Sequence, residues 1–494
     1  MGAYSHAGSG CVVARRRLLT AALGGAALGV LAACGEDAPP PAPTVESTAS
    51  PPSASTAAPA ATQAAEPPPA SGPPAGTRLP DIAARVRQAQ GDVGILPPAP
   101  ATASDSPIAV PADILAARAD RLVALSERDQ LSATAWRNIG WKTDFETSLV
   151  HFDEIFSGGV PRDGIPPIDD PKFTDFAEAV QFVAGRGPVV ALRVNGEARA
   201  YPLQILTYHE IVNDVIGGRP VAVTFCPLCN SSVVFDREVF GSVLRFGVSG
   251  NLRNSDLIMW DNVTETWWQQ LTGEGLVGHL AGVTLDFVPS QLISFDEFRA
   301  AFRDGQVLSQ DTGFPRPYGR NPYGGYDTVD DRPFQSDGRL EERPFLFQGR
   351  LDTRFRATER VVALEINGEA VAYPFSVLSE QRVVNDSVGG EKIVVLWTPN
   401  TVSALDKSDI ATSTAVGSGV AYGRVVDGRE LTFAVKDDAF TDQETGSTWD
   451  VTGRALTGEL AGAELPPLVH ANHFWFAWAA FKPATRVYTA NSNS

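Results

Sequence analysis

The sequence predicts an α+β fold that is mostly β, in which one β-rich module with short helices occurs twice behind a disordered tether. Residues 189–202 (VVALRVNGEARAYP) and 361–374 (VVALEINGEAVAYP) are identical at eleven of fourteen positions. Short apolar runs between turn-forming residues follow in both halves of the chain, as in strands. Chance does not supply an identity of this length, so we infer an internal duplication.

Each copy is expected to open with a β-hairpin. Asn195-Gly196 and Asn367-Gly368 stand between alternating apolar runs, and Asn-Gly favours the two-residue turns of hairpins. Pro202 is expected to open a helix that extends to about Val215, since proline suits a first helical turn. Further strands are expected in the first copy at residues 221–225, 232–235, 243–248 and 257–260.

Two segments upstream of the first copy also have clear patterns. Residues 112–128 show apolar side chains at helical spacing with charges between them, which predicts one amphipathic helix. Residues 158–167 (GGVPRDGIPP) are rich in glycine and proline and predict an irregular surface or site loop.

The first 33 residues have the pattern of an export signal. Three arginines at 15–17 precede an apolar run, 18–33, that is too short for a confident membrane span. Residues 31–34 (LAAC) look like a bacterial lipobox, and this resemblance implies cleavage before Cys34 and a lipid on its sulfur. The arginines resemble a twin-arginine signal, with general secretion and an uncleaved anchor as alternatives. We expect a protein lipid-anchored to the cell membrane, facing the periplasm or the cell exterior.

Composition divides the rest of the chain. Residues 34–106 are rich in proline, alanine and serine and predict a disordered tether. Residues 107–310 are expected to hold a helix and the first copy, 311–360 a connecting segment, and 361–494 the second, degenerate copy. Loss of the signal's three arginines would take the net charge from −18 to −21. This acidity argues against nucleic acid or anionic lipid headgroups as partners.

The second copy keeps the turn residues of the first and loses its metal-binding types. At a constant offset of 172, His209 becomes glutamine, and Cys226 and Cys229 become threonine. If Cys11 leaves with the signal and Cys34 carries lipid, these two cysteines form the only remaining pair, so there is no disulfide framework. Such a Cys-x-x-Cys loop can chelate a soft metal or form a redox disulfide.

Two thiolates, an imidazole and a thioether would make a soft metal site. His209 is expected to face inward from its helix, where a core histidine is the alternative. Met259 is the only methionine after residue 1 and faces Phe440 at an offset of 181, a pairing that an ordinary core exchange also explains. His279, which meets Glu459, is a spare candidate. This donor set favours copper, with zinc as the alternative.

Five ordered motifs carry a family resemblance: DEIFSGGVPRDGIPPIDDP, YPLQILTYHEIVND, TFCPLCNSSVVFDR, FGVSGNLRNSDLIMWD and TWWQQLTGEGLVG. They resemble the bacterial and archaeal family catalogued as domain of unknown function 3179, over residues 153–300 with a degenerate echo at 361–465. The resemblance implies that Cys226, Cys229 and His209 belong to the family's motifs. It also implies that the second copy has no site.

Three functions remain open at this point. The first is an extracytoplasmic lipoprotein that binds copper or zinc for electron transfer or metal handling, with a redox or metal-donor protein as partner. The second is a thiol–disulfide oxidoreductase, although the cysteine loop runs into a strand and lacks the helix N-terminus that would lower a thiol pKa. The third is a binding or scaffold lipoprotein. No hydrolase pattern stands out, and whether the protein is an enzyme stays open.

Overall fold

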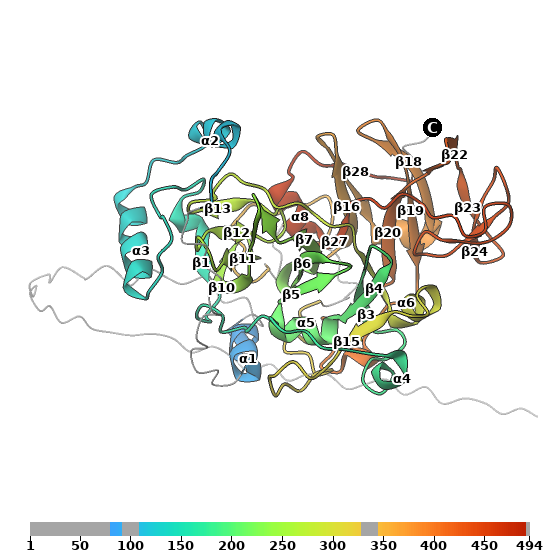
Figure 1. Ribbon diagram of the computed structural model, residues 1–494, viewed down its shortest axis with the longest axis horizontal. Coiled ribbons are helices and arrows are strands. Elements are labelled where there is room, and N and C mark those ends of the chain that lie inside the picture. Colours follow the sequence, from blue (N-terminus) through green and yellow to red (C-terminus); the bar gives the residue numbers. More distant parts are fainter. Residues whose placement is uncertain (1–79, 91–107, 328–343, 491–494) are drawn as a thin grey trace, which may run out of the picture. The chain divides into compact units, whose positions relative to one another are not determined.

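Figure 1 shows the computed structural model, which describes residues 80–90, 108–327 and 344–490. Strands predominate over short helices in these ranges, so the expected mostly-β α+β fold is confirmed. The predicted signal peptide (1–33), the lipid site at Cys34 and most of the predicted tether lie outside the described residues. Within the described ranges, no helix is both long and apolar enough to span a membrane.

The first repeat consists of three main sheets, with strand orders β14-β3-β4-β15-β2, β5-β6-β7 and β1-β10-β11-β12-β13. Its elements are η1 (Phe152–Glu154), β1 (Ile155–Ser157), β2 (Phe173–Thr174), α4 (Phe176–Ala179), β3 (Pro188–Val194), β4 (Glu197–Pro202), α5 (Leu203–His209), β5 (Ile211–Ile216), β6 (Arg219–Cys226), η2 (Pro227–Cys229), β7 (Ser231–Asp236), β8 (Glu238–Val239), β9 (Ser242–Val243), β10 (Phe246–Arg253), β11 (Asp256–Asp261), β12 (Trp267–Gln269), β13 (Gly275–Val277), β14 (Gln291–Ser294), α6 (Phe295–Ala301) and β15 (Gln306–Leu308).

The second repeat reproduces this topology, which confirms the duplication. Its sheets have the orders β27-β16-β17-β28, β18-β19-β20 and β23-β24-β25-β26. Its elements are β16 (Arg360–Ile366), β17 (Glu369–Pro374), α7 (Phe375–Gln381), β18 (Val383–Val388), β19 (Glu391–Thr398), η3 (Ile410–Thr412), β20 (Ser418–Gly423), β21 (Val425–Val426), β22 (Arg429–Glu430), β23 (Phe433–Lys436), β24 (Ala439–Asp442), β25 (Thr448–Trp449), β26 (Ala455–Thr457), β27 (Ala471–Phe474), α8 (Trp475–Phe481) and β28 (Arg486–Val487). The correspondence therefore continues to the last strand of each repeat.

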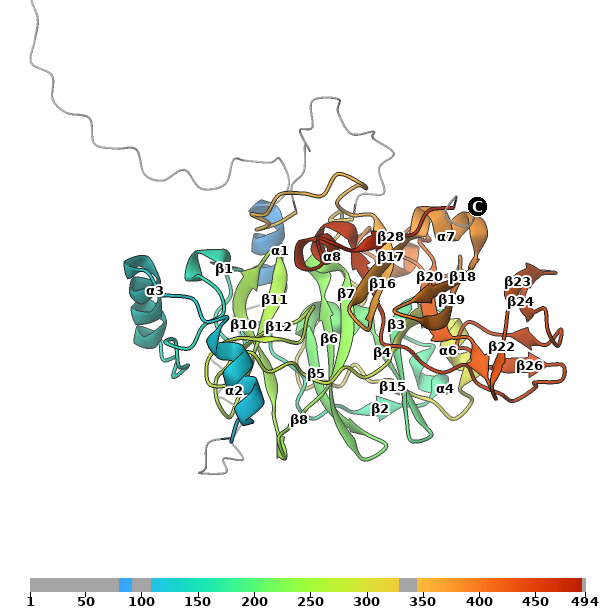
Figure 2. The ribbon, with the colours of Figure 1, turned by 90° about the horizontal axis from the view of Figure 1, so that it is seen from above.

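The two repeats pack against each other in a reciprocal way. In both views, strands β5–β7 lie between β10–β13 and the second repeat's strands β16–β20 (Figures 1 and 2). Strand β14 of the first repeat contacts β20, and its counterpart β27 in the second repeat contacts β7, the counterpart of β20. Buried residues of both repeats share one apolar cluster, as Val189 and Ile293 do with Leu396 and Val420. Each repeat thus covers an apolar face of the other.

The Asn-Gly hairpins form as predicted. Asn195 and Gly196 have φ of 49° and 89°, and Asn367 and Gly368 have φ of 50° and 82°. Strands β3 and β4 pair up to the residues flanking the turn, as do β16 and β17. Positive φ at both central residues suits the twist of antiparallel strands, which is why asparagine and glycine occupy these positions.

Three predicted elements have different bounds in the structure. The single helix at 112–128 is two helices, α2 (Ala112–Ala119) and α3 (Glu127–Asn138), because Ser126 and Asp129 form a capping box that starts a new helix. The helix expected to reach Val215 ends with α5 at His209, since Glu210 has φ of 57° and β5 follows. The strand expected at 243–248 is divided between β9 and β10.

Part of the predicted tether is a docked helix. Helix α1 (Pro80–Gln90) lies within residues 34–106, and its Val86 is 6% exposed in the core. Its Gln90 Nε2 donates to the Tyr208 carbonyl at 3.0 Å. Proline, alanine and serine dominate the composition of residues 34–106 as a whole, so composition alone does not reveal the short apolar face of α1.

We expect Val86→Asp to release α1, because a buried carboxylate without a partner costs roughly 2 kcal/mol or more. Limited proteolysis with trypsin should then cleave at Arg85 and Arg87 much faster than in the parent protein. The control is Gln88→Asp on the exposed side of the same helix, which should leave the rate unchanged. Equal cleavage of both variants would show that α1 is not held by Val86.

Candidate functional site

The cysteine pair is held in a tight connection between two paired strands. Cys226 ends β6 and pairs with Ser231 of β7, and the short turn η2 between them ends at Cys229. Pro227 occupies its first position, and Asn230 closes it with φ of 47°. The two thiols are free, and both side chains are almost completely buried. The loop therefore brings two sulfurs together inside the core.

A carboxylate absent from the sequence prediction completes the cluster. One ligand atom each from Cys226, Cys229 and Asp256 lies within 4.8 Å of the other two, and all three residues are buried. Asp256 is the first residue of β11, directly after the two-residue turn Asn254-Ser255 that joins β10 to β11. The tip of this hairpin carries Asp256 to the cysteines.

Hydrogen bonds orient the Asp256 carboxylate. Its Oδ2 accepts from Gln269 Nε2 at 2.7 Å and from the Leu271 amide at 2.9 Å. Its Oδ1 has no hydrogen bond of normal geometry within the described residues, although both thiols lie beside the carboxylate and lower its pKa. Burial is the larger effect and raises the pKa of Asp256 to about 6. One oxygen is thus anchored and the other is available.

Glu210 is a second buried acid beside the cluster. Its carbonyl accepts the Phe225 amide at 2.8 Å, which places it next to the end of β6. Its Oε1 accepts a hydrogen bond from the Tyr323 hydroxyl at 3.2 Å. Burial raises the pKa of Glu210 to about 8, and the nearby charge of Asp256 acts in the same direction. Without a cation nearby, this side chain is mostly protonated at neutral pH.

The surroundings also keep the thiols protonated. Burial raises the pKa of both Cys226 and Cys229, and the charge of Asp256 raises them further. A protonated thiol is a poor nucleophile and a poor ligand. A bound cation would reverse both effects, because it stabilises the thiolates and the carboxylate at once.

The second repeat has lost every donor of this cluster. The cysteines are replaced by Thr398 and Thr401, and Glu210 by Arg382, which has the same left-handed backbone with φ of 62°. The hairpin of β10 and β11 runs from the pair Phe246–Asp261 to the pair Arg253–Asp256 at its tip. The corresponding hairpin of β23 and β24 runs from Phe433–Asp442 to Lys436–Ala439 and is six residues shorter. No counterpart of the Asp256 tip exists there, so the donors are a property of the first repeat.

The structure does not bring His209 to the sulfurs. Its Nδ1 donates to the Pro166 carbonyl at 2.7 Å, and its Nε2 accepts from the Tyr318 hydroxyl at 2.6 Å. Burial lowers the pKa of His209 to about 4, so the ring is neutral. The left-handed Glu210 turns the chain after α5, and Glu210 rather than His209 lies beside the cysteines. His209 is therefore a core histidine with both nitrogens satisfied.

The other two candidates lie outside the cluster of three donors. Met259 is fully buried in β11, opposite Val248 and Trp268, in the same apolar core as the cysteines. Its role as a weak fourth ligand stays a prediction. His279 Nε2 is hydrogen-bonded to the Ile108 carbonyl at 2.7 Å, and its ring takes no part in the cluster.

A small cavity adjoins the cluster. It has a volume of about 40 Å³, and its walls include Glu210, Tyr323, Leu228 between the two cysteines and Leu257 next to Asp256. Val86 of α1 forms part of its far wall. A volume of this size holds one to a few water molecules. Of the buried acids and thiols described above, Glu210 lines this cavity, whereas Cys226, Cys229 and Asp256 do not.

Comparison with known proteins gives a family. Residues 162–485 match the family described as "Protein of unknown function (DUF3179)". The chain belongs to this family. The match spans both repeats and extends beyond the cysteine-bearing repeat. No curated protein and no solved structure matches the chain.

We expect Glu210→Gln to stabilise the metal-free protein by an amount that grows as the pH rises from about 4.5 to about 8. The folded-state pKa of about 8 lies above the ordinary 4.5, so the cost of ionising Glu210 is absent below pH 4.5 and complete above pH 8. The difference between 8 and 4.5 corresponds to on the order of 5 kcal/mol, which the substitution should add to the stability above pH 8. Thermal unfolding across pH measures this, with exposed Glu238→Gln as the control. A gain that does not change with pH would contradict the assignment.

Proposed function

We propose that this protein binds one transition-metal ion at Cys226, Cys229 and Asp256, and that zinc is preferred over copper. The observation that supports this most directly is the convergence of two thiols and a carboxylate within 4.8 Å in a fully buried place. An apolar interior gives no reason to gather acids. Buried acids are costly unless they are paired or bind a metal.

The charges around the cluster favour a cation. Burial, hydrogen bonds and neighbouring acids shift the pKa values of the cysteines and of Asp256. Glu210 adds a fourth acidic group beside them. Two thiolates and one carboxylate carry three negative charges. A divalent ion offsets more of this charge than a monovalent one, so the electrostatics favour zinc over copper(I).

The donor chemistry leads to the same choice. Copper was expected from an imidazole and a weak thioether acting with the two sulfurs, and the imidazole of His209 is engaged elsewhere. A carboxylate oxygen is a harder donor, and zinc accepts sulfur and carboxylate ligands together. The fourth position would fall to Glu210, to a water in the adjoining cavity or to Met259. Copper remains the alternative metal.

The proposed setting is a lipoprotein held outside the cytoplasm through Cys34. There the site would serve metal handling, with a metal-donor protein as partner, because zinc does not exchange electrons. Electron transfer would require copper. The cavity beside Glu210, with a volume of only about 40 Å³, also favours metal handling over chemistry on a large substrate. The scaffold alternative predicts no metal.

The redox alternative has one observation in its favour. The two sulfurs are close and unpaired, as a reduced dithiol requires. Burial and the raised pKa of both thiols oppose it, because exchange begins with an accessible thiolate. We therefore place it second.

The test is metal analysis of protein purified from its native compartment, combined with thiol counting. We expect about one zinc per chain and no reactive thiol until a strong chelator removes the metal, which should also lower the melting temperature. Cys226→Ser and Asp256→Asn should weaken binding by more than about 100-fold, since even outer ligand partners are worth 10- to 100-fold.

The matched control is Thr398→Ser, at the position in the second repeat that corresponds to Cys226. It should bind metal like the parent protein. Copper in place of zinc would correct the metal and restore electron transfer as a function. A metal-free protein with a reducible disulfide would refute the proposal in favour of the redox alternative. A metal-free protein with two inert thiols would leave the scaffold function.

A further inference from the structure

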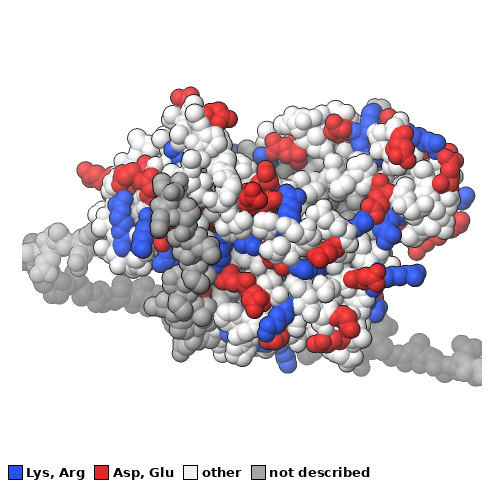
Figure 3. Space-filling view, in the orientation of Figure 1, with Lys and Arg blue, Asp and Glu red and all other residues white. Residues whose placement is uncertain are grey.

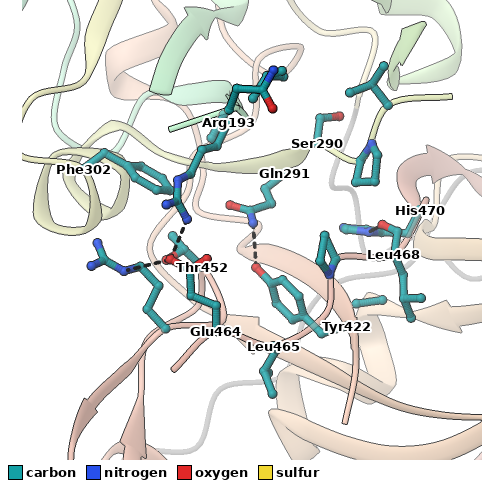
Figure 4. Close-up of a pocket in the computed structure, with 18 of the residues that line it drawn as sticks. Arg193, Ser290, Gln291, Phe302, Tyr422, Thr452, Glu464, Leu465, Leu468 and His470 are labelled. Atoms are coloured by element: carbon teal, nitrogen blue, oxygen red, sulfur yellow. Dashed lines mark hydrogen bonds and ion pairs between the residues drawn. The ribbon is translucent and has the colours of Figure 1, made fainter. Parts of the chain in front are cut away.

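A larger cavity lies between the two repeats, apart from the cysteine cluster. Its volume is about 410 Å³, within the usual range for small-molecule sites. Its walls come from β3 and β14 of the first repeat, and from β20 and the loops before β26 and β27 of the second. Figure 4 shows polar side chains from both repeats pointing toward one another across it. The duplication itself creates this space.

The walls carry more positive than negative charge. Three arginines line the cavity, whereas Glu464 is the only acid among its lining residues. Glu464 pairs with Arg193 at 2.5 Å (Figure 4). It also pairs with Arg454 at 3.8 Å. Arg219 pairs with Asp236 at 2.6 Å. A third carboxylate, that of Asp450, lies beside Arg454, so each guanidinium group has an acid near it.

This gathering of three arginines and one acid on the cavity wall contrasts with the rest of the molecule. The whole chain has a net charge of −18. On the face shown in Figure 3, lysine and arginine side chains lie interspersed with aspartate and glutamate. Guanidinium groups that reach a cavity surface can exchange an internal carboxylate partner for that of a small anion.

The duplication supplies an internal comparison for these arginines. Each of the three stands where the other repeat has glutamate: Arg193 matches Glu365, Arg219 matches Glu391, and Arg454 matches Glu274. The last match follows from the bridges Arg454–Glu464 and Glu274–Thr284, which occupy the same place in the two repeats. The fold accepts the opposite charge at all three positions, so it does not require the arginines. Their gathering at one cavity needs another reason.

The remaining wall is apolar, with a few hydrogen-bonding groups. Phe302, Leu465 and Leu468 line it beside Tyr422. The Tyr422 hydroxyl donates to the Val451 carbonyl at 2.9 Å and accepts from Gln291 Nε2 at 2.7 Å. The Oε1 of Gln291 is buried and accepts no hydrogen bond within the described residues. A ligand with an apolar body and a hydrogen-bond donor would satisfy it.

We propose that the cavity between the repeats binds a small organic monocarboxylate with a hydroxyl or amine on an apolar body. The carboxylate would contact Arg193 and the neighbouring guanidinium groups, which suit it in geometry as well as charge. The apolar body would pack on Phe302 and Leu468. The donor would reach Gln291 Oε1. This site does not depend on the metal cluster.

The test is isothermal titration of the full chain with two probes, 4-hydroxybenzoate and 3-hydroxybutyrate. We expect at least one to bind and to bind more weakly as salt is raised. Phenol, which lacks the carboxylate, and inorganic phosphate, which lacks the apolar body, should bind at least about 10-fold more weakly than that probe. Failure of both carboxylates to bind would overturn the proposal. Phosphate binding as tightly as the carboxylate would also overturn it.

Charge reversal locates the site. Arg193→Glu introduces the residue that the second repeat has at the matching position, and the side chain is half-exposed. It should weaken binding at least about 10-fold. Arg429→Glu, which alters an exposed ion pair with Glu459 away from the cavity, should leave binding unchanged. Unfolding curves check that both variants are folded. Equal weakening by both would mean that only the overall charge matters.

Discussion

The reciprocal packing of β14 on β20 and of β27 on β7 is the constraint on which the rest of the structure depends. Strand β7 begins two residues after Cys229, so the second repeat supports the strand that holds the cysteine loop. Burial of the apolar clusters that the repeats share stabilises the fold. This stabilisation offsets the cost of keeping several acids in the interior of the first repeat. The second repeat thus stabilises a site to which it contributes no donor.

Departures from the repeat symmetry mark the places where chemistry is concentrated. The first repeat has gained or kept two cysteines, Glu210 and a longer hairpin, where the second has threonines, Arg382 and a short turn. An arginine at the position of Glu210 would repel a cation, so the two repeats differ in charge as well as in ligands. The cavity between the repeats shows the same kind of asymmetry with the opposite sign, because its arginines match glutamates. In a duplicated chain, the residues that both repeats share are those that the fold requires, and residues found in only one repeat are candidates for another role.

The fold was largely predictable because its signals are local. Asn-Gly turns and apolar alternation act over a few residues, and the duplication could be recognised by comparing the chain with itself. The site was predictable only in part. The paired cysteines were found from their spacing, but Glu210 and Asp256 were missed. Two signals could have found them: the change of Glu210 to Arg382, and the six-residue difference between the hairpins.

The sequence by itself determined the duplication, the strands, the hairpin turns and the closeness of Cys226 to Cys229, since each depends on contacts along a short stretch of chain. Only the tertiary structure decided which third donor meets the sulfurs. The His209 ring, at the end of α5, is hydrogen-bonded to Pro166 and Tyr318, and the length of the β10–β11 hairpin brings Asp256 to the cysteines. Both outcomes depend on how distant strands pack, which no local pattern records. The docking of α1 was hidden for the same reason, because its apolar face is complementary to a surface formed by residues far along the chain.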